Sequence, residues 1–225
     1  LKNIKIKDNK VIGISVKPQN GCEYDIETDS LVLAVGHSAR DTFEMIYSLG
    51  IQMIQKPFSV GARIEHPQKL IDVSQYGKFA GNPNLGAADY KFAVHLKNGR
   101  GVYTFCMCPG GNVVAAASED GRLVTNGMSN FARDGINANS ALLIGVDTND
   151  FGSEHPLAGV EFQRKLEKAA FRLGGENYFA PVQRVEDFLN SRKSKNIGSV
   201  KPTYSPGVTP CNLDDCLPKC ITDSM

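Results

Sequence analysis

The 225-residue sequence lacks several features that define whole classes of proteins. No apolar run approaches the about 20 residues that a membrane-spanning helix needs, and the start, LKNIKIKDNK, contains no hydrophobic leader. The 25 basic and 24 acidic residues nearly cancel, so the chain has no charge excess of the kind that binds nucleic acid or an anionic membrane. We therefore expect a globular protein that does not act on nucleic acid or membranes. Because the chain begins with Leu1 inside strand-like sequence, we also expect it to be an internal part of a longer protein.

Familiar catalytic motifs are absent as well. The sequence contains no G-x-G-x-x-G, no G-x-S-x-G and no Walker motif, so it cannot hold a complete dinucleotide-binding unit of the Rossmann type. The four histidines have no H-E-x-x-H spacing, and the cysteines lack the usual zinc-ligand spacing, so we expect no metal site. Six cysteines without a secretion signal favour a reducing cytoplasm; they are Cys22, Cys106, Cys108, Cys211, Cys216 and Cys220.

The first 50 residues predict an antiparallel meander followed by a strand, a turn and a helix. Turn signals at 8–9 and 19–21 separate alternating segments. Residues 31–35, LVLAV, are apolar at every position, which is typical of a strand buried on both faces of a sheet. The segment 36–50 then predicts a turn and a helix, with Gly50 at the helix end.

Beyond residue 50 the pattern mixes strands, loops and two helices. Strands are expected at Pro57–Pro67, Tyr90–Leu96, Gly101–Met107, Asn112–Ser118 and Ala141–Val146. Helical spacing of apolar residues predicts helices at Leu157–Leu173 and Val182–Leu189. The stretch 69–89 is expected to be mostly loop, and the four prolines from residue 202 onward predict an irregular tail.

The turn at Gly36 is the first candidate site. Gly36 has no side chain to keep a ligand from the backbone, and the helix start offers N–H groups to anions. His37 is the one histidine whose position suggests a role in a site. An ordinary strand-to-helix connection explains the same residues, and the motif alone favours that interpretation.

CMCPGG, residues 106–111, is the second candidate. On a regular strand Cys106 and Cys108 would point to the same face, where they could bind metal, form a redox pair or line a flavin, although a disulfide across one residue would be strained. The competing interpretation is a pair of buried, inert thiols. The Pro109-Gly110-Gly111 turn could still present free backbone N–H groups to a cofactor.

GMSNFARDGINANS, residues 127–140, is the third candidate. It is rich in Asn, Ser, Arg and Asp and poor in core-forming residues. It predicts either a wide polar loop or the lining of a polar ligand pocket.

Six stretches together resemble one family. They are LVLAVGHSARDTFEMIYSLGI, KPFSVGARIEHPQKLID, QYGKFAGNPNLGAADYK, GRGVYTFCMCPGGNVVAAASEDGRLVTNGMSNFARDGINANSALL, PLAGVEFQRKLEKAAFRLGG and PTYSPGV. In this order, and over nearly the whole chain, they resemble the bacterial FAD-dependent, or NAD(FAD)-utilising, dehydrogenases, most of which are uncharacterised. The resemblance implies a two-part flavoprotein, in which a Rossmann-like FAD domain outside this chain is split by an inserted domain.

The resemblance also implies which residues approach the cofactor, without assigning a catalytic acid or base. From the strand-turn-helix segment these are Gly36, His37, Ser38 and Arg40. From the inserted domain they are Cys108, Pro109, Gly110, Gly111, Ser129, Asn130 and Arg133. FAD is the implied cofactor of the full-length protein, NAD(P) is a further candidate, and this chain alone is expected to bind FAD weakly or not at all.

The predicted fold class is α+β, a mixed or antiparallel β-sheet domain with flanking helices. Residues 1–50 are expected to return to the FAD domain, 51–200 to form the inserted substrate-side domain, and 201–225 to form a Pro- and Cys-rich tail. The predicted function is an internal portion of a FAD-dependent oxidoreductase, inactive on its own, whose partners are the FAD domain and a small-molecule substrate. The alternative is a non-catalytic interaction or oligomerisation domain, for example one that forms a homodimer.

Overall fold

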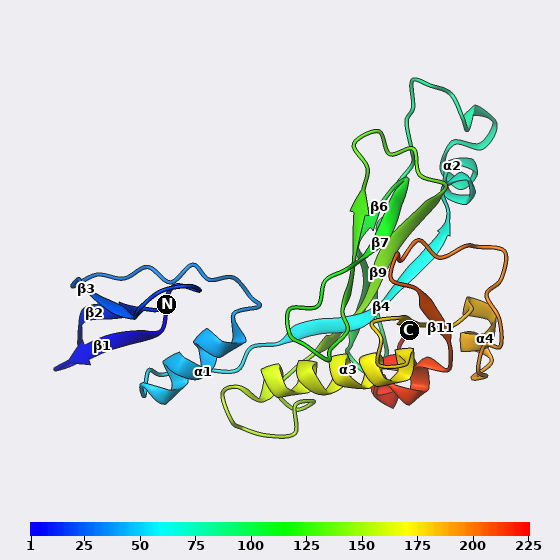
Figure 1. Cartoon of the computed structure of the whole chain (residues 1–225). Helices are drawn as coiled ribbons and strands as arrows, with labels where there is room; N and C mark the ends of the chain where they lie inside the picture. The colour runs from blue at the N-terminus through cyan, green and yellow to red at the C-terminus, as the bar shows by residue number, and fades with distance from the viewer. The chain divides into compact units, whose positions relative to one another are not determined.

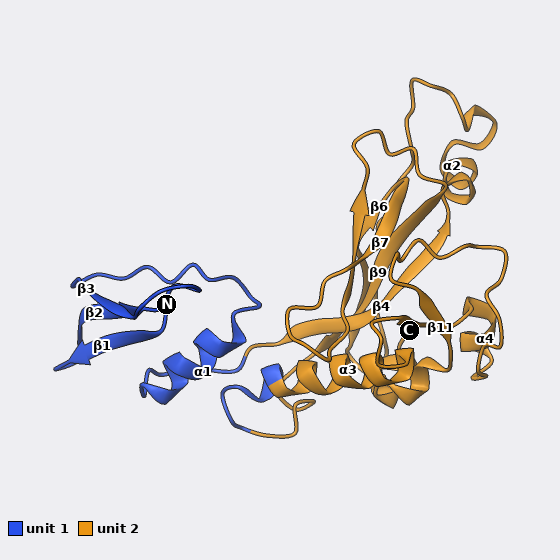
Figure 2. Cartoon of the chain, viewed as in Figure 1, with its two compact units in different colours: residues 1–55, 154–160 blue, residues 56–153, 161–225 orange.

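The computed structural model describes residues 1–225 and consists of two compact units (Figures 1 and 2). Unit 1 comprises residues 1–55 and 154–160, and unit 2 comprises residues 56–153 and 161–225. Several antiparallel sheets, one parallel strand pair and a few helices make this an α+β fold, as predicted. None of its helices is both long enough and apolar enough to cross a membrane. The division by function into 1–50, 51–200 and 201–225 stays a prediction.

Unit 1 contains the predicted meander. Strands β1 (Asn3–Lys7), β2 (Lys10–Val16) and β3 (Tyr24–Glu27) form an antiparallel sheet in that order. Asp8 and Asn9 join the first two strands with φ angles of 50° and 58°. Two positive φ angles in succession are the geometry of a tight hairpin turn, which Asp and Asn tolerate better than other side chains.

The strand expected at residues 31–35 does not form. These residues belong to no sheet, and the Val32 side chain is 90% exposed. A strand needs neighbours that accept its backbone hydrogen bonds and cover its side chains, and no strand of residues 1–225 pairs with this stretch. The helix after it is α1 (Arg40–Ser48), which ends before Gly50 with a φ of 74°, as predicted.

Unit 2 is built on one four-stranded antiparallel sheet (Figure 1). Its strands lie in the order β4 (Phe58–Pro67), β9 (Asn137–Val146), β6 (Gly101–Cys108) and β5 (Ala93–His95). Ile144 and Val146 on the central strand β9 are almost fully buried. At the start of β4, Phe58 stacks on Phe151 with ring centroids 5.0 Å apart, and Phe151 contacts Phe162 of helix α3 (Ala158–Gly174).

The tail of the chain completes a second core. Strands β7 (Gly111–Ala115) and β8 (Thr125–Ser129) form a hairpin, and β10 (Ala180–Val182) pairs in parallel with β11 (Val208–Pro210). The short elements α4 (Val185–Leu189), η2 (Leu213–Asp215) and α5 (Lys219–Thr222) follow or flank this pair. Buried Val113, Leu123 and Tyr204 pack together there with residues of α3.

Two secondary-structure predictions were wrong in unit 2. The stretch 69–89 contains helix α2 (Gln68–Tyr76) and the short η1 (Gly77–Phe79). Gln68 is the buried residue of α2, and Leu70 and Val73 are exposed, so burial of an apolar stripe does not hold this helix in place. The helix expected from Val182 starts only at Val185, because residues 180–182 pair with the tail as β10.

Candidate functional site

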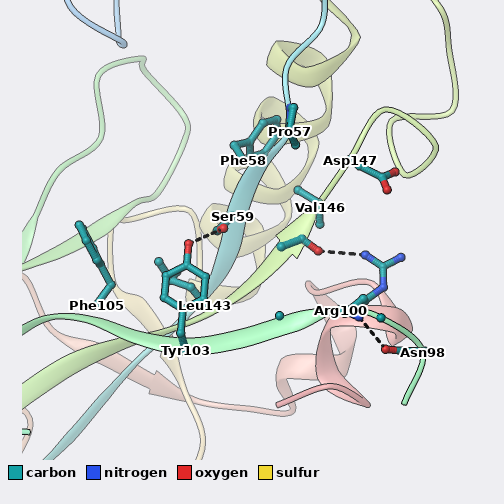
Figure 3. A pocket seen from close by; sticks show the side chains of 13 residues that line it. Pro57, Phe58, Ser59, Asn98, Arg100, Tyr103, Phe105, Leu143, Val146 and Asp147 are labelled. Carbon is teal, nitrogen blue, oxygen red and sulfur yellow. Dashed lines mark hydrogen bonds between the residues drawn. The ribbon is translucent and has the colours of Figure 1, made fainter. Parts of the chain in front are cut away.

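A groove of about 840 Å³ opens on the main sheet of unit 2, where β4 begins and β9 ends (Figure 3). Strand register explains its lining. Ser59 lies opposite Gly145, and Tyr103 lies opposite Leu143, so these residues share one face of the sheet. Its apolar lining includes Tyr103, Phe105 and Leu143, and its polar lining includes Asn98, Arg100 and Asp147.

Two hydroxyl groups meet in the groove. The Ser59 Oγ and the Tyr103 hydroxyl oxygen are 2.6 Å apart (Figure 3). They approach each other from β4 and β6 across the intervening strand β9, on which Gly145 lies opposite Ser59. One hydroxyl proton is used between them, so the pair retains one donor and several lone pairs for a ligand.

Arg100 fixes the turn at residues 147–150, which follows β9 at the polar end of the groove. It donates to both carboxylate oxygens of Asp150, at 2.9 and 2.6 Å, and to the carbonyl of Gly145 at 3.0 Å. The Arg100 guanidinium keeps the pKa of the Asp150 carboxyl below its usual value, and the bond to Asp150 raises the pKa of Arg100. The positive charge of Arg100 is therefore matched inside the protein.

The groove contains none of the residues that the family resemblance implied. Sequence reasoning missed it because its floor is made by two glycines on different strands, Gly145 within β9 and Gly101 at the start of β6. A glycine within a strand pattern was the available signal, since such residues often mark a close approach to the backbone.

The Cys108–Gly111 segment is buried rather than open. All four residues are buried, and the N–H of Gly110 donates to the Gln68 side-chain oxygen at 2.8 Å. Gln68 is itself buried and also donates to the Ala88 carbonyl at 2.9 Å. The expectation that this turn presents a free Gly110 N–H was wrong, because α2 places an amide oxygen against it.

The Ser129–Arg133 segment lies beside that turn. Gly111 pairs with Ser129 across the β7–β8 hairpin, and the Gly110 carbonyl accepts the N–H of Gly135 at 3.1 Å. Asn130 and Arg133 are exposed, and Arg133 has a φ of 51°. The structure therefore places two of the three candidate segments, 108–111 and 129–133, next to each other. The polar stretch 127–140 is not one loop, because β8 ends inside it and β9 begins at Asn137.

The remaining candidates lie in unit 1. Gly36 has a φ of 78°, and a Cβ added there would meet no atom within 4 Å. His37 and Ser38 are exposed, with the His37 Nδ1 and the Ser38 Oγ 3.0 Å apart. Arg40, the first residue of α1, is only 7% exposed. Gly36, His37 and Ser38 thus form an open turn, whereas Arg40 is part of the packed helix start.

A polar network under the β7–β8 hairpin was not predicted. The Arg63 guanidinium donates to the side-chain oxygens of Asn139, at 2.5 Å, and Asn126, at 3.1 Å. A Cβ at Gly127 of β8 would lie 2.2 Å from Arg63 Nη1, so the hairpin passes directly over this side chain. Asn139 is fully buried. Neutral amide oxygens therefore fix a charged side chain between the sheet and the hairpin.

Glu65 anchors the tail in the same region. Its carboxylate accepts the Thr203 hydroxyl at 2.5 Å, the Thr203 N–H at 3.0 Å and the Asn137 amide at 3.0 Å. The Thr203 hydroxyl oxygen in turn accepts the N–H of Val113 on β7 at 2.8 Å. One carboxylate thus links β4, β9, the tail and, through Thr203, the hairpin.

His66 and Tyr90 form a half-buried pair. The His66 Nε2 is 2.9 Å from the Tyr90 hydroxyl. Burial lowers the pKa of His66 and raises the pKa of Tyr90. Both side chains are therefore held in their neutral forms near neutral pH.

We expect His66 to make the protein less stable in mild acid. Its folded-state pKa lies below the unfolded value of about 6.5, so the unfolded chain binds the proton more readily. The free energy of unfolding should fall as the pH drops below about 6.5. Urea unfolding at about pH 7.5 and about pH 5.5 measures this, with His66→Gln as the variant that keeps hydrogen-bonding groups without titrating. If both proteins lost the same stability on acidification, His66 would not be the source.

Cys106 and Cys108 do not share a face. One extra residue on β6 between Phe105 and Cys108 shifts the register against β9, which is a β-bulge. Cys106 has a φ of 46° and is exposed, whereas Cys108 is buried. The bulge overturns the prediction of a common face. Among residues 1–225, no group of three or more His, Cys, Asp or Glu side chains is placed to hold a metal ion.

We expect thiol labelling to divide the six cysteines into two equal groups. Cys22, Cys106 and Cys220 are exposed, whereas Cys108, Cys211 and Cys216 are buried. Burial raises the pKa of Cys211 to about 11 and that of Cys216 to about 12, and only the thiolate reacts. Mass spectrometry after iodoacetamide treatment at about pH 8 should find the exposed thiols modified first, with all six modified in urea. Fast modification of Cys216 in the folded protein would contradict its burial.

Comparison with known proteins identifies the family. Residues 57–225 match the family described as "FAD-dependent protein, C-terminal domain-like", so the chain belongs to that family. The match begins one residue after the start of unit 2. The chain is also 51% identical over 226 residues to an uncharacterised protein of Clostridium beijerinckii, in an alignment that covers all of this chain and 42% of that protein. The chain thus spans less than half the length of this relative.

Proposed function

We propose that the full-length protein is a FAD-dependent oxidoreductase and that residues 57–225 form the substrate-facing side of its flavin site. The observation that carries the proposal is the match of these residues to a C-terminal domain of FAD-dependent proteins. FAD would supply the hydride-accepting ring. The pairing of the turn at 108–111 with the segment 129–133 supports a preformed wall, because both candidate segments meet on one scaffold.

The residues of this chain do not by themselves fit the phosphates of FAD. The Gly110 turn is buried and its N–H is taken by Gln68, so it cannot cradle an anion. The turn at Gly36–Ser38 is exposed but contributes a single glycine, and the sequence holds no G-x-G-x-x-G. We therefore propose that the phosphate-binding part of the site lies outside this chain and that unit 2 binds and orients the substrate.

Flavin content tests this proposal. The full-length protein, purified without added cofactor, should carry the visible absorbance of bound flavin, whereas the 225-residue chain mixed with FAD should not retain it after gel filtration. Anaerobic addition of NADH or NADPH then tests nicotinamide as the electron donor by bleaching of that absorbance. A colourless full-length protein that does not bind added FAD would refute the proposal. Tight stoichiometric binding of FAD by the 225-residue chain alone would refute the proposal that its flavin site is incomplete.

The second candidate function is an interaction domain. Met128, Phe131 and Ile136 are 63%, 106% and 88% exposed, which is unusual for large apolar side chains in one short stretch. If this stretch joins two copies, light scattering should show a mass that rises with concentration, and Phe131→Ser should abolish the rise. Self-association without any flavin in the full-length protein would favour this function over the first.

A further inference from the structure

Two glycines in the floor of the groove have no packing reason to be glycine. A Cβ at Gly101 would meet no atom within 4 Å, and one at Gly145 would meet only the Gly101 carbonyl oxygen, at 3.9 Å. Neither has a positive φ. Gly61 on β4 is different, because its Cβ would lie 1.9 Å from the Leu142 carbonyl oxygen. Glycine weakens a strand unless something must approach the backbone closely, so Gly101 and Gly145 mark such an approach.

The shape of the groove suits a flat ring. The glycine backbone leaves a surface without side chains, and Phe105 and Leu143 supply apolar contacts beside it. The Ser59–Tyr103 hydroxyl pair offers hydrogen bonds to a polar substituent. Ligand sites commonly combine an apolar lining with a few placed polar groups in this way.

The charges of the groove disfavour an anion. Asp150 neutralises Arg100 through two hydrogen bonds. Asp147, the other charged residue of the lining, also interacts electrostatically with Arg100, so two carboxylates face one guanidinium there. A carboxylate or phosphate on the ligand would therefore be repelled, and a positive charge would be attracted.

We propose that this groove binds a planar aromatic or heteroaromatic molecule whose polar substituent bears no negative charge and preferably a positive one. The inference rests on the proposed function only in calling that molecule the substrate of the oxidoreductase. The ring lies on the Gly101–Gly145 floor, and its substituent reaches the hydroxyl pair or Asp147.

Three probes with the same ring and different charge test the inference. Benzamidine, benzamide and benzoate are titrated into the chain, and binding is followed by NMR through the ring signals of Tyr103 and Phe105. Benzamidine should bind most tightly and benzoate about tenfold more weakly or not at all. Gly145→Val should abolish the shifts by filling the floor, with Gly101→Ala as a second filling variant. Ala115→Val is the matched control, because it adds bulk to an exposed strand residue outside the groove.

Each failure has a distinct meaning. Benzoate binding as tightly as benzamidine would overturn the charge preference. The site would be overturned if none of the three probes shifted the ring signals. It would also be overturned if folded Gly145→Val and Gly101→Ala bound the probes as tightly as the unchanged chain does. Because flavin content of the full-length protein is measured separately, a flavin-containing protein without ring binding refutes this inference alone.

Discussion

Replacement of Gly110 by alanine should destabilise unit 2 by about 3 kcal/mol or more. The φ of Gly110 is +50°, which already disfavours a side chain. A Cβ there would also lie 1.9 Å from the backbone oxygen of Arg133, and this segment is tied to Gly110 by the hydrogen bond from the Gly135 N–H, so the backbone atom cannot move aside cheaply. Urea unfolding followed by circular dichroism measures the loss.

Gly86→Ala separates the two causes of that loss. Gly86 also has a positive φ, +68°, but nothing lies within 4 Å of its Cβ position. We expect it to cost only about 1 kcal/mol, the cost of the left-handed backbone alone. If the two variants were equally unstable, the close packing of the turn at 109–111 against residues 133–135 would not contribute.

Glu65→Ala should cost about 3 kcal/mol and loosen the tail. The substitution removes the acceptor for the Thr203 hydroxyl, the Thr203 N–H and the Asn137 amide. Asn137 is 5% exposed, so water cannot readily replace the lost acceptor. Hydrogen exchange at the amides of Thr203 and Val113 should accelerate together, because Thr203 links the carboxylate to β7.

Glu65→Gln is the matched control for this prediction. It keeps the side-chain length and one acceptor oxygen while removing the charge that strengthens the hydrogen bonds. We expect a loss of about 1 kcal/mol and slower exchange at Thr203 than in the alanine variant. Unchanged exchange at Thr203 in Glu65→Ala would show that the carboxylate does not hold the tail.

Local signals account for the elements that were predicted correctly. The Asp8-Asn9 turn and the glycine that ends α1 are fixed by conformations that few residues adopt. The apolar spacing of α3 defines a helix over residues 158–174 without reference to any partner. The strand predicted at 31–35 was wrong because a local apolar pattern is not sufficient for a strand. No strand of residues 1–225 pairs with this stretch.

The sequence by itself determined the α+β class, the main strands and the membership of a FAD-dependent family. Only the tertiary structure decided the groove, the bulge at Cys106 and the polar network at Arg63 and Glu65. These features depend on register between strands and on contacts such as Glu65 with Thr203, which are 138 residues apart. Periodicity encodes which face of an element is apolar, but it does not encode which distant residue lies against that face.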